Sequence, residues 1–258
     1  MKFNTLEEKC KYYQSLTDYR LIPNSYVLVH CDGRAFSSLI KKKFERPFDN
    51  NFIFMMNETA KYLCENVSGC KMAYVQSDEI TLVLTDFETE TTDSFFGYRM
   101  CKLISTIAAM ATAKFNRLWM QSQENIELSI KELPLVTFDC KVWNVPFYNE
   151  VIAWLIYRQN DCVRNSINQT SSSVFSHKEL EGLKTQDRLI KLKEKGVDWE
   201  SFDDGVKYGR FIYKQSIITT IPQTNVTTER YAWITNKAFR ITDNKMKFDN
   251  LNIIPKLS

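Results

Sequence analysis

The order of apolar segments between residues 26 and 145 constrains the fold more than any other feature of this chain. A run rich in β-branched and aromatic residues, Tyr26 to Cys31, is typical of a buried strand that stops at Asp32. In chain order we then expect a helix at about 51–66, strands at 71–76 and 80–85, a helix at about 94–118 capped by Asp93, and a further strand pair at 135–145. This is the order of a ferredoxin-like antiparallel sheet backed by two helices, so the sequence predicts an α+β fold.

Beyond Pro146 the pattern changes to longer polar helices and later strands. We expect a helix from about 149 to 168, a Ser/Thr-rich loop at 169–173, a charged helix from about 177 to 195, and strands within 207–242. The sequence therefore predicts a core at 1–145 and a helical and β extension at 146–258 that packs on the core as one compact unit.

Composition limits the possible partners and compartments. The chain has 258 residues, of which 44% are hydrophobic and 25% charged, as in an ordinary globular protein. Its net charge of only +3 requires that any nucleic-acid partner be held by a local basic patch. The seven cysteines form no Cys-x-x-Cys pair and no apolar leader is visible, which favours a reduced intracellular compartment. No run approaches the roughly 18 apolar residues of a membrane span, so we expect a soluble protein.

The scarcity of histidine excludes several kinds of site. The chain contains only His30 and His177, too few for a zinc site based on histidine, and they offer little basis for a Ser-His-Asp hydrolase. His30 lies inside an apolar run, where a buried role is the simpler interpretation. Carboxylates are left as the residues most able to carry chemistry.

Two aspartates occupy positions that the predicted sheet would bring together. Asp32 ends the first strand, and Asp78 lies at the tip of the hairpin that the sheet places beside it. Neighbouring carboxylates repel each other, and divalent cations relieve that repulsion. Gly33 permits close approach of the backbone, and its carbonyl could also bind a metal. Taken singly, an Asp-Gly turn and an acidic hairpin tip are both common surface features.

Three longer segments together resemble one family. They are HCDGRAFSSLIKKKFERPFD at 30–49, YVQSDEITLVL at 74–84 and RQNDC at 158–162. Their order and spacing are similar to those of the tRNA-histidine guanylyltransferase superfamily, the 3′-to-5′ tRNA polymerases, over about the first two-thirds of the chain. The resemblance implies a polymerase-palm-like catalytic core within residues 1–145 that adds nucleotides at a tRNA 5′ end.

The resemblance also implies roles for individual residues. Asp32 and Asp78 would be catalytic and, with the Gly33 carbonyl, would hold two Mg²⁺ ions. Glu79 matches the adjacent acid of the family, and it either supports catalysis or only flanks the site. The residues expected to contact the nucleotide are Asp32, Gly33, Arg34, Ala35, Phe36, Ser37, Arg46, Ser77, Asp78, Arg99 and Lys102. For Arg99 and Lys102, which share one helix face, the alternative is a solvated surface.

The sequence after the RQNDC motif bears on the branch of the family. Members dedicated to tRNA-histidine continue with His-Ile-Asn-Asn, whereas this chain continues with Val163, Arg164, Asn165 and Ser166. This departure resembles the "like-protein" branch, which repairs truncated tRNA 5′ ends with the opposite strand as template. Ser37 stands where many eukaryotic members have a histidine, which leaves the activation of the 5′ end open.

The implied substrates are tRNA, ATP, and GTP or other nucleoside triphosphates, and the implied assembly is a homotetramer. ATP would activate a 5′-monophosphate, and the 3′-hydroxyl of the incoming nucleotide would then displace AMP. Three alternatives stay open. These are guanosine addition to tRNA-histidine alone, a palm-type nucleotide cyclase, and an RNA-binding protein whose acidic turn has no catalytic role.

Overall fold

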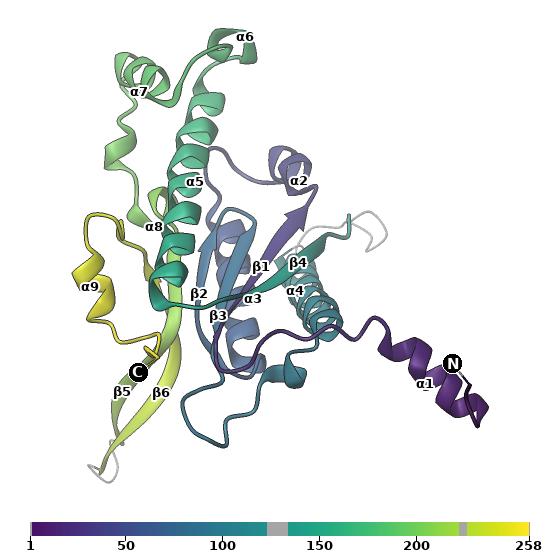
Figure 1. Ribbon diagram of the computed structural model, residues 1–258. Helices are drawn as coiled ribbons and strands as arrows, with labels where there is room; N and C mark the ends of the chain where they lie inside the picture. Colours follow the sequence, from purple (N-terminus) through teal and green to yellow (C-terminus); the bar gives the residue numbers. More distant parts are fainter. Residues whose placement is uncertain (1, 123–133, 222–225, 258) are drawn as a thin grey trace.

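The structure is a computed structural model that describes residues 2–122, 134–221 and 226–257 (Figure 1). Across these residues the chain forms a six-stranded antiparallel sheet with the strand order β4-β1-β3-β2-β5-β6. The strands are β1 (Tyr26–Arg34), β2 (Cys70–Gln76), β3 (Glu79–Leu84), β4 (Thr137–Val145), β5 (Arg210–Ile221) and β6 (Val226–Lys237).

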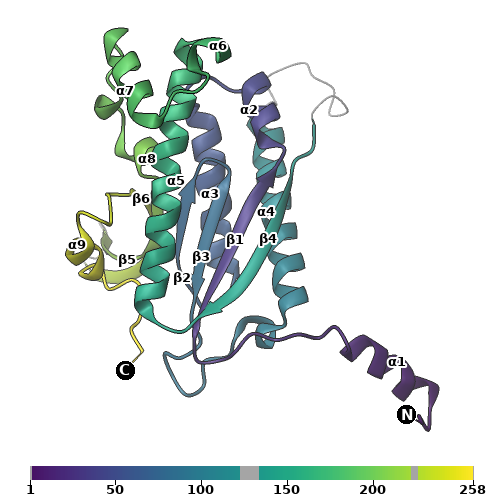
Figure 2. The same cartoon turned by 45° about the horizontal axis from the view of Figure 1, so that its top comes forward.

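Helices cover both faces of this sheet (Figures 1 and 2). The long helices α3 (Asn50–Asn66) and α4 (Met100–Ser122) pack on one face around the larger apolar core. Helix α5 (Tyr148–Val174) crosses the other face over a second apolar cluster. The shorter elements are α1 (Leu6–Ser15), α2 (Phe36–Lys43), η1 (Phe95–Tyr98), α6 (His177–Leu180), α7 (Thr185–Glu194), η3 (Trp199–Ser201), α8 (Asp204–Lys207) and α9 (Lys245–Asp249).

The connectivity of the first four strands matches the predicted order. The elements β1, α3, β2, β3, α4 and β4 follow one another along the chain, and β1 lies between β4 and β3 in the sheet. This is the split β-α-β arrangement of a ferredoxin-like sheet. The prediction of an antiparallel sheet backed by helices is confirmed.

Alternation along β1 decides which of its residues face which layer. Val29 and Cys31 belong to the core under α3 and α4, whereas Leu28 belongs to the cluster under α5. His30 and Asp32 continue the series of Leu28, so they lie on the face that α5 crosses. The polar end of β1 is thereby directed away from the larger core.

Several predicted strand boundaries were wrong. The first strand does not stop at Asp32, because Gly33 and Arg34 still pair with β4. Glu79 does not belong to the hairpin tip, because it is the first residue of β3 and pairs with Gln76. The segment predicted as a strand pair at 135–145 forms the single strand β4 in its described residues.

The predicted start of the long central helix was also wrong. α4 begins at Met100 and not near residue 94, so Asp93 does not cap it. Phe96 and Gly97 have left-handed backbone angles, with φ of 54° and 57°, which an α-helix excludes. These residues form part of the separate turn η1 instead.

Two predictions about the helices after β4 were wrong as well. α5 continues through 169–173, where a loop was expected. The Thr170 and Ser171 hydroxyls donate to the carbonyl oxygens of Ser166 and Ile167, at 2.8 and 2.7 Å, so the helix itself satisfies them. The charged helix expected at 177–195 is two helices, α6 and α7, and Gly182 between them has a φ of 76°.

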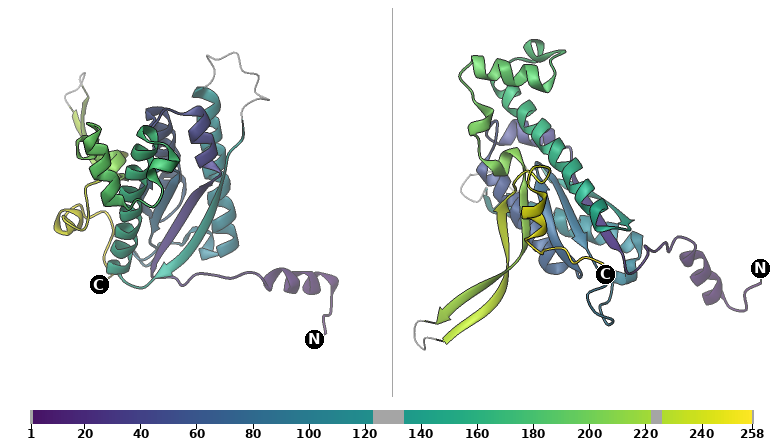
Figure 3. Two further views of the ribbon diagram at one scale, coloured as in Figure 1. Left: turned by 90° about the horizontal axis from the view of Figure 1, so that it is seen from above. Right: turned by 60° about the vertical axis from the view of Figure 1, so that its left-hand side comes forward.

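The extension after residue 146 adds to the sheet of the core. β5 pairs with β2 from Arg210 to Tyr213, so strands from both predicted segments belong to one continuous sheet. Beyond Tyr213, the described residues of β5 and β6 pair only with each other, and the two strands project from the body as a hairpin (Figure 3). Among the described residues, no helix is both long and apolar enough to cross a bilayer.

Candidate active site

Two predicted site carboxylates lie at one end of the sheet, Asp32 on β1 and Asp78 in the neighbouring hairpin turn. Asp78 lies in the turn between β2 and β3, and its carbonyl oxygen accepts a hydrogen bond from the N–H of Gly33 at 3.1 Å. Asp32 pairs across the sheet with Glu79. Ser77 has a φ of 45°, which makes the turn tight, and its hydroxyl donates to the Asp78 carboxylate at 2.9 Å. We call Asp32 and Asp78 the acidic pair.

The acidic pair is electrostatically unfavourable without a cation. Burial raises the pKa of Asp78 from the usual range of an aspartate to about 6. Burial also raises the pKa of Asp32, and the negative charge of Glu79 raises it further. Both shifts mean that the surroundings disfavour the ionised carboxylates.

A divalent cation fits this chemistry. Two partly buried carboxylates with raised pKa values gain from a nearby positive charge, and Mg²⁺ is commonly bound by one or two carboxylates together with substrate phosphates. The part of the chain that the structure describes contains no group of three or more His, Cys, Asp or Glu side chains suited to a metal. The remaining ligands would therefore be backbone carbonyls, water and the phosphates of a substrate.

Glu79 is occupied by partners other than the acidic pair. Its Oε2 accepts a hydrogen bond from Nε2 of Gln76 at 2.6 Å and forms an ion pair with Arg158 of α5. Nε2 of His30 lies 3.8 Å from the same oxygen, but burial and the charge of Arg158 lower the pKa of His30 to about 4, so this histidine is neutral near pH 7. In this arrangement Glu79 joins the hairpin to α5.

The motif at 158–162 supplies this connection. Arg158 also forms an ion pair with Asp161 at 2.7 Å, one turn along the helix. Gln159 is buried, and its side chain bonds three backbone groups, the carbonyls of Tyr208 and Phe239 and the N–H of Ile241, at 3.1, 3.0 and 2.8 Å. The motif therefore ties α5 both to the hairpin of the acidic pair and to the C-terminal extension.

The turn after Gly33 leads directly into α2. A Cβ at Gly33 would lie 2.4 Å from the ring of Phe36, so only glycine fits there. Phe36 is buried, and Ala35 has a left-handed φ of 62° and no polar side chain with which to cap the helix. The first N–H groups of α2 are therefore available for an anion, as at other helix N-termini. Ser37 lies in this first turn, but its side chain is outside the described part of the structure.

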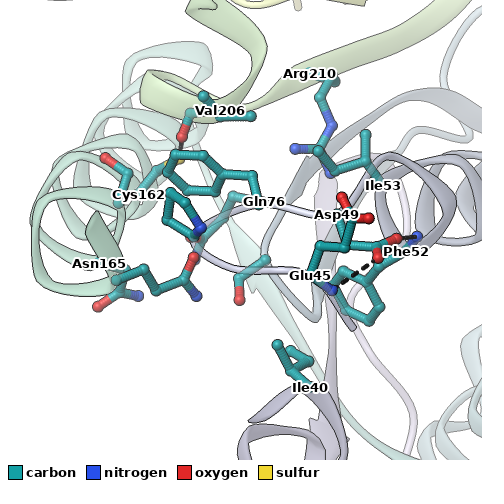
Figure 4. Close-up of a pocket in the computed structure, with 15 residues that line it drawn as sticks. Ile40, Glu45, Asp49, Phe52, Ile53, Gln76, Cys162, Asn165, Val206 and Arg210 are labelled. Carbon is teal, nitrogen blue, oxygen red and sulfur yellow. Dashed lines mark hydrogen bonds between the residues drawn. The ribbon is translucent and has the colours of Figure 1, made fainter. Parts of the chain in front are cut away.

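A pocket opens beside the hairpin turn (Figure 4). Its apolar wall includes Phe52 and Ile53, and the buried Oε1 of Gln76 has no hydrogen-bond partner among the described residues. We call it the hairpin-tip pocket, and its lining comprises Ile40, Glu45, Pro47, Phe48, Asp49, Phe52, Ile53, Gln76, Ser77, Cys162, Asn165, Ser166, Gln169, Val206 and Arg210. An apolar wall with a few polar groups is the usual form of a small-molecule site.

A second hollow joins the hairpin-tip pocket to Asp78. It is lined by Ile40, Pro47, Ser77 and Gln169, which also line the pocket, and in addition by Arg46, Asp78, Asn168 and Ser172. Arg46 donates a hydrogen bond to the carbonyl oxygen of Ser172 at 2.9 Å, and its side chain is exposed. The structure thus brings Arg46 and Ser77 to the same hollow as Asp78.

A comparison with protein families bears directly on these residues. The model of the family described as tRNAHis guanylyltransferase matches residues 7–146, which include the acidic pair, the turn into α2 and Arg46. The chain belongs to this family. Its members are nucleotidyltransferases that act on tRNA.

Similar proteins support the same assignment. A solved bacterial tRNA(His) guanylyltransferase-like protein in complex with ATP has a TM-score of 0.82 and 29% identity, over 95% of this chain and 98% of its own. A complex of such a protein with GTP has a TM-score of 0.78 and 28% identity. An uncharacterised protein of Acanthamoeba polyphaga mimivirus is 28% identical over 97% of this chain and 91% of its own. The tRNA(His) guanylyltransferase of Debaryomyces hansenii is 25% identical over 76% of each chain.

Arg99 and Lys102 lie at the opposite end of the sheet from the acidic pair. Arg99 forms an isolated β-bridge with Arg20, which precedes β1. Asp32 lies six residues after Tyr26, the first residue of β1, or about 20 Å along that strand. Arg99 forms an ion pair with Asp18 at 2.6 Å. The monomer therefore does not bring these two basic residues to the acidic pair, and their contact with phosphate stays a prediction.

Asp139 is an acidic residue that sequence reasoning missed. It lies on β4 directly opposite Asp32, with its side chain exposed. Asp139, Asp32 and Glu79 thus form a row across three strands. The register of β1 on β4 places Asp139 there, and no motif in the sequence indicates that register.

Proposed function

We propose that this chain adds nucleotides to the 5′ end of truncated tRNA, in the 3′-to-5′ direction and with the opposite strand as template. The observation that carries the proposal is the acidic pair: both carboxylates have raised pKa values, and Asp78 lines the hollow that adjoins the hairpin-tip pocket. Bacterial relatives bound to ATP and to GTP support a nucleoside triphosphate as the ligand.

In this proposal the split β-α-β sheet acts as a polymerase palm. Asp32, Asp78 and the carbonyl of Gly33 hold two Mg²⁺ ions, which would activate the attacking hydroxyl and neutralise the triphosphate. The acidic pair supports this role because the folded chain keeps both carboxylates close while offering them little positive charge.

The other residues bind and orient the nucleotide. The N–H groups at the start of α2, from Phe36 onward, meet phosphate oxygens, and the exposed Arg46 adds a charged contact on the same side. The base enters the hairpin-tip pocket, where Oε1 of Gln76, which has no partner in the described part of the chain, accepts a hydrogen bond from an amino or imino group of the base. Arg158 and Glu79 position the turn that carries Asp78.

Two displacements at phosphorus complete the reaction. In the first, an oxygen of the tRNA 5′-monophosphate attacks the α-phosphorus of ATP, and pyrophosphate leaves. In the second, the 3′-hydroxyl of the incoming nucleotide attacks the activated 5′-phosphorus, loses its proton and releases AMP. A tRNA that already carries a 5′-triphosphate omits the first step.

The sequence at 163–166 favours the repair branch of the family. Val163 stands where members dedicated to tRNA-histidine have a histidine. Guanosine addition to tRNA-histidine alone is the second candidate, and a palm-type nucleotide cyclase is the third. Magnesium dependence and a homotetrameric assembly are part of the proposal.

The proposal is tested by extension of a tRNA that lacks its first nucleotide. We expect the wild type to add the nucleotide complementary to the template, and Asp32→Asn and Asp78→Asn to lose at least about 100-fold in rate. Asp93→Asn, which changes an exposed carboxylate, should keep full activity.

Different outcomes select between the candidates. Normal extension by either acidic-pair variant contradicts the proposed site. Addition restricted to guanosine on histidine tRNA supports the second candidate, and a cyclic product formed from GTP without RNA supports the third.

A further inference from the structure

Three aromatic side chains form a cluster on the face of the sheet that α5 crosses. Trp143 of β4 and Trp154 of α5 have ring centroids 4.6 Å apart, and Tyr157, one turn along α5, lies 5.5 Å from Trp154. The side chain of Tyr157 is exposed, with a relative exposure of 54%, and the two tryptophans are half-buried. We call these three residues the aromatic cluster.

The aromatic cluster belongs to the same face as the acidic pair. Trp154 packs against His30 with ring centroids 5.6 Å apart, and His30 precedes Asp32 by two residues on β1. Trp143 pairs with Leu28, four positions from the pair Asp32 and Asp139, or about 13 Å along the strand. This distance corresponds to about four stacked bases at 3.4 Å each.

One buried cation supports the cluster, and one exposed cation lies on the same face. The guanidinium of Arg158 lies 5.1 Å from the ring centre of Tyr157 and 5.8 Å from that of Trp154. Because Arg158 is buried between α5 and the hairpin, it packs against both rings from the interior side. Lys141, opposite His30, is exposed on the same face. Rigid aromatic rings beside cationic groups are the usual platform for unpaired bases of RNA.

The aromatic cluster is separate from the hairpin-tip pocket. That pocket takes its α5 residues from a later part of the helix, between Cys162 and Gln169, whereas the cluster takes Trp154 and Tyr157. The incoming nucleotide therefore leaves the cluster free for the other substrate.

From these contacts we propose that the aromatic cluster stacks an unpaired base at the acceptor end of the RNA, with the exposed ring of Tyr157 as the main contact. This inference rests on the proposed function, because it takes RNA as the second substrate. It adds a site for the template end of that RNA, on a stretch of α5 that precedes the residues lining the hairpin-tip pocket.

The test is a double-mutant cycle of RNA-binding affinity, with one change in the protein and one in the RNA. The probes are a tRNA lacking its first nucleotide and the same tRNA with abasic units in place of its unpaired 3′-strand bases. We expect Tyr157→Ala to weaken binding of the intact RNA about tenfold and to leave binding of the abasic RNA unchanged. Tyr157→Phe should restore tight binding, because a phenylalanine ring stacks equally well.

The controls separate stacking from general damage. Tyr13→Ala removes a tyrosine of α1 with the same 54% exposure and should not change RNA binding, while the affinity of Tyr157→Ala for GTP should equal that of the wild type. Equal affinity of Tyr157→Ala and wild type for the intact RNA overturns the inference, as does an equal loss with both RNAs. If the wild type binds the RNA but never extends it, the proposed function fails while the cycle still reports on stacking.

Discussion

At the scale of single residues, Asp78 links the site to the stability of the fold. Burial raises its pKa to about 6, above the usual aspartate value of 3.8. The folded chain therefore holds a proton at pH values where the unfolded chain has released it. The stability that depends on this proton is fully present below about pH 4 and is lost as the pH rises through about 6.

Replacing Asp78 by Asn removes this ionisation. In metal-free buffer we expect the free energy of unfolding of Asp78→Asn to be close to that of the wild type near pH 4 and to exceed it at pH 8 by about 3 kcal/mol. Urea unfolding at both pH values measures the difference. A gain in stability that is the same at pH 4 and at pH 8 would contradict the burial of a charged carboxylate.

At the scale of elements, the connection between α5 and the β2–β3 hairpin depends on Arg158. It lies between Glu79 on the hairpin and Asp161 on α5, and all three side chains are largely buried. Removing one partner from such a group leaves charges without compensation, which costs far more than the loss of an exposed pair.

We expect Arg158→Leu to lower the free energy of unfolding by about 3 kcal/mol. The matched control is Arg164→Leu, because Arg164 also pairs with Asp161 but is exposed, and its loss should cost less than about 1 kcal/mol. Adding Glu79→Gln to Arg158→Leu should recover part of the loss, since one unpaired charge is then removed. Purely additive losses in urea unfolding would argue against a coupled group.

The predictable parts of the fold were those encoded within single elements. Periodicity predicted α3 to within one residue of its start, and the apolar runs around Ser77 predicted β2 and β3. The continuation of α5 through Thr170 and Ser171 was not predictable, because Ser and Thr side chains are common in loops. In the folded chain their hydroxyls instead donate to helix carbonyl groups four residues earlier. Asp139 and the partners of Glu79 depend on register and on packing between distant elements, so no local pattern reveals them.

At the scale of the whole molecule, two parts extend beyond the body. Helix α1 projects from it (Figure 1), and none of its residues is buried. The outer part of the β5–β6 hairpin also projects, and Ile218 on it has a relative exposure of 72%. The apolar surface of this hairpin is typical of interfaces between subunits.

We expect the wild type to sediment as a homotetramer of the 30.3 kDa chain, and Ile218→Lys to shift it to a smaller species. Sedimentation velocity measures both, and Lys214→Ala, at a less distal position of the same strand, serves as a control that keeps the apolar surface. A wild type that sediments as a monomer would refute the assembly, and an unchanged mass of Ile218→Lys would place the interface elsewhere.

The position of α5 has a consequence for how successive additions proceed. The helix contributes Cys162 to Gln169 to the hairpin-tip pocket and Trp154 and Tyr157 to the aromatic cluster, so in the proposed reaction the nucleotide and the end of the RNA would contact different stretches of one helix. After each addition the new 5′ end of the RNA must leave the hairpin-tip pocket, and the aromatic cluster would keep hold of the template strand while the next nucleoside triphosphate enters. We therefore expect a gap of several nucleotides to be filled during a single encounter, because the RNA would stay bound while its 5′ end shifts by one position after each addition.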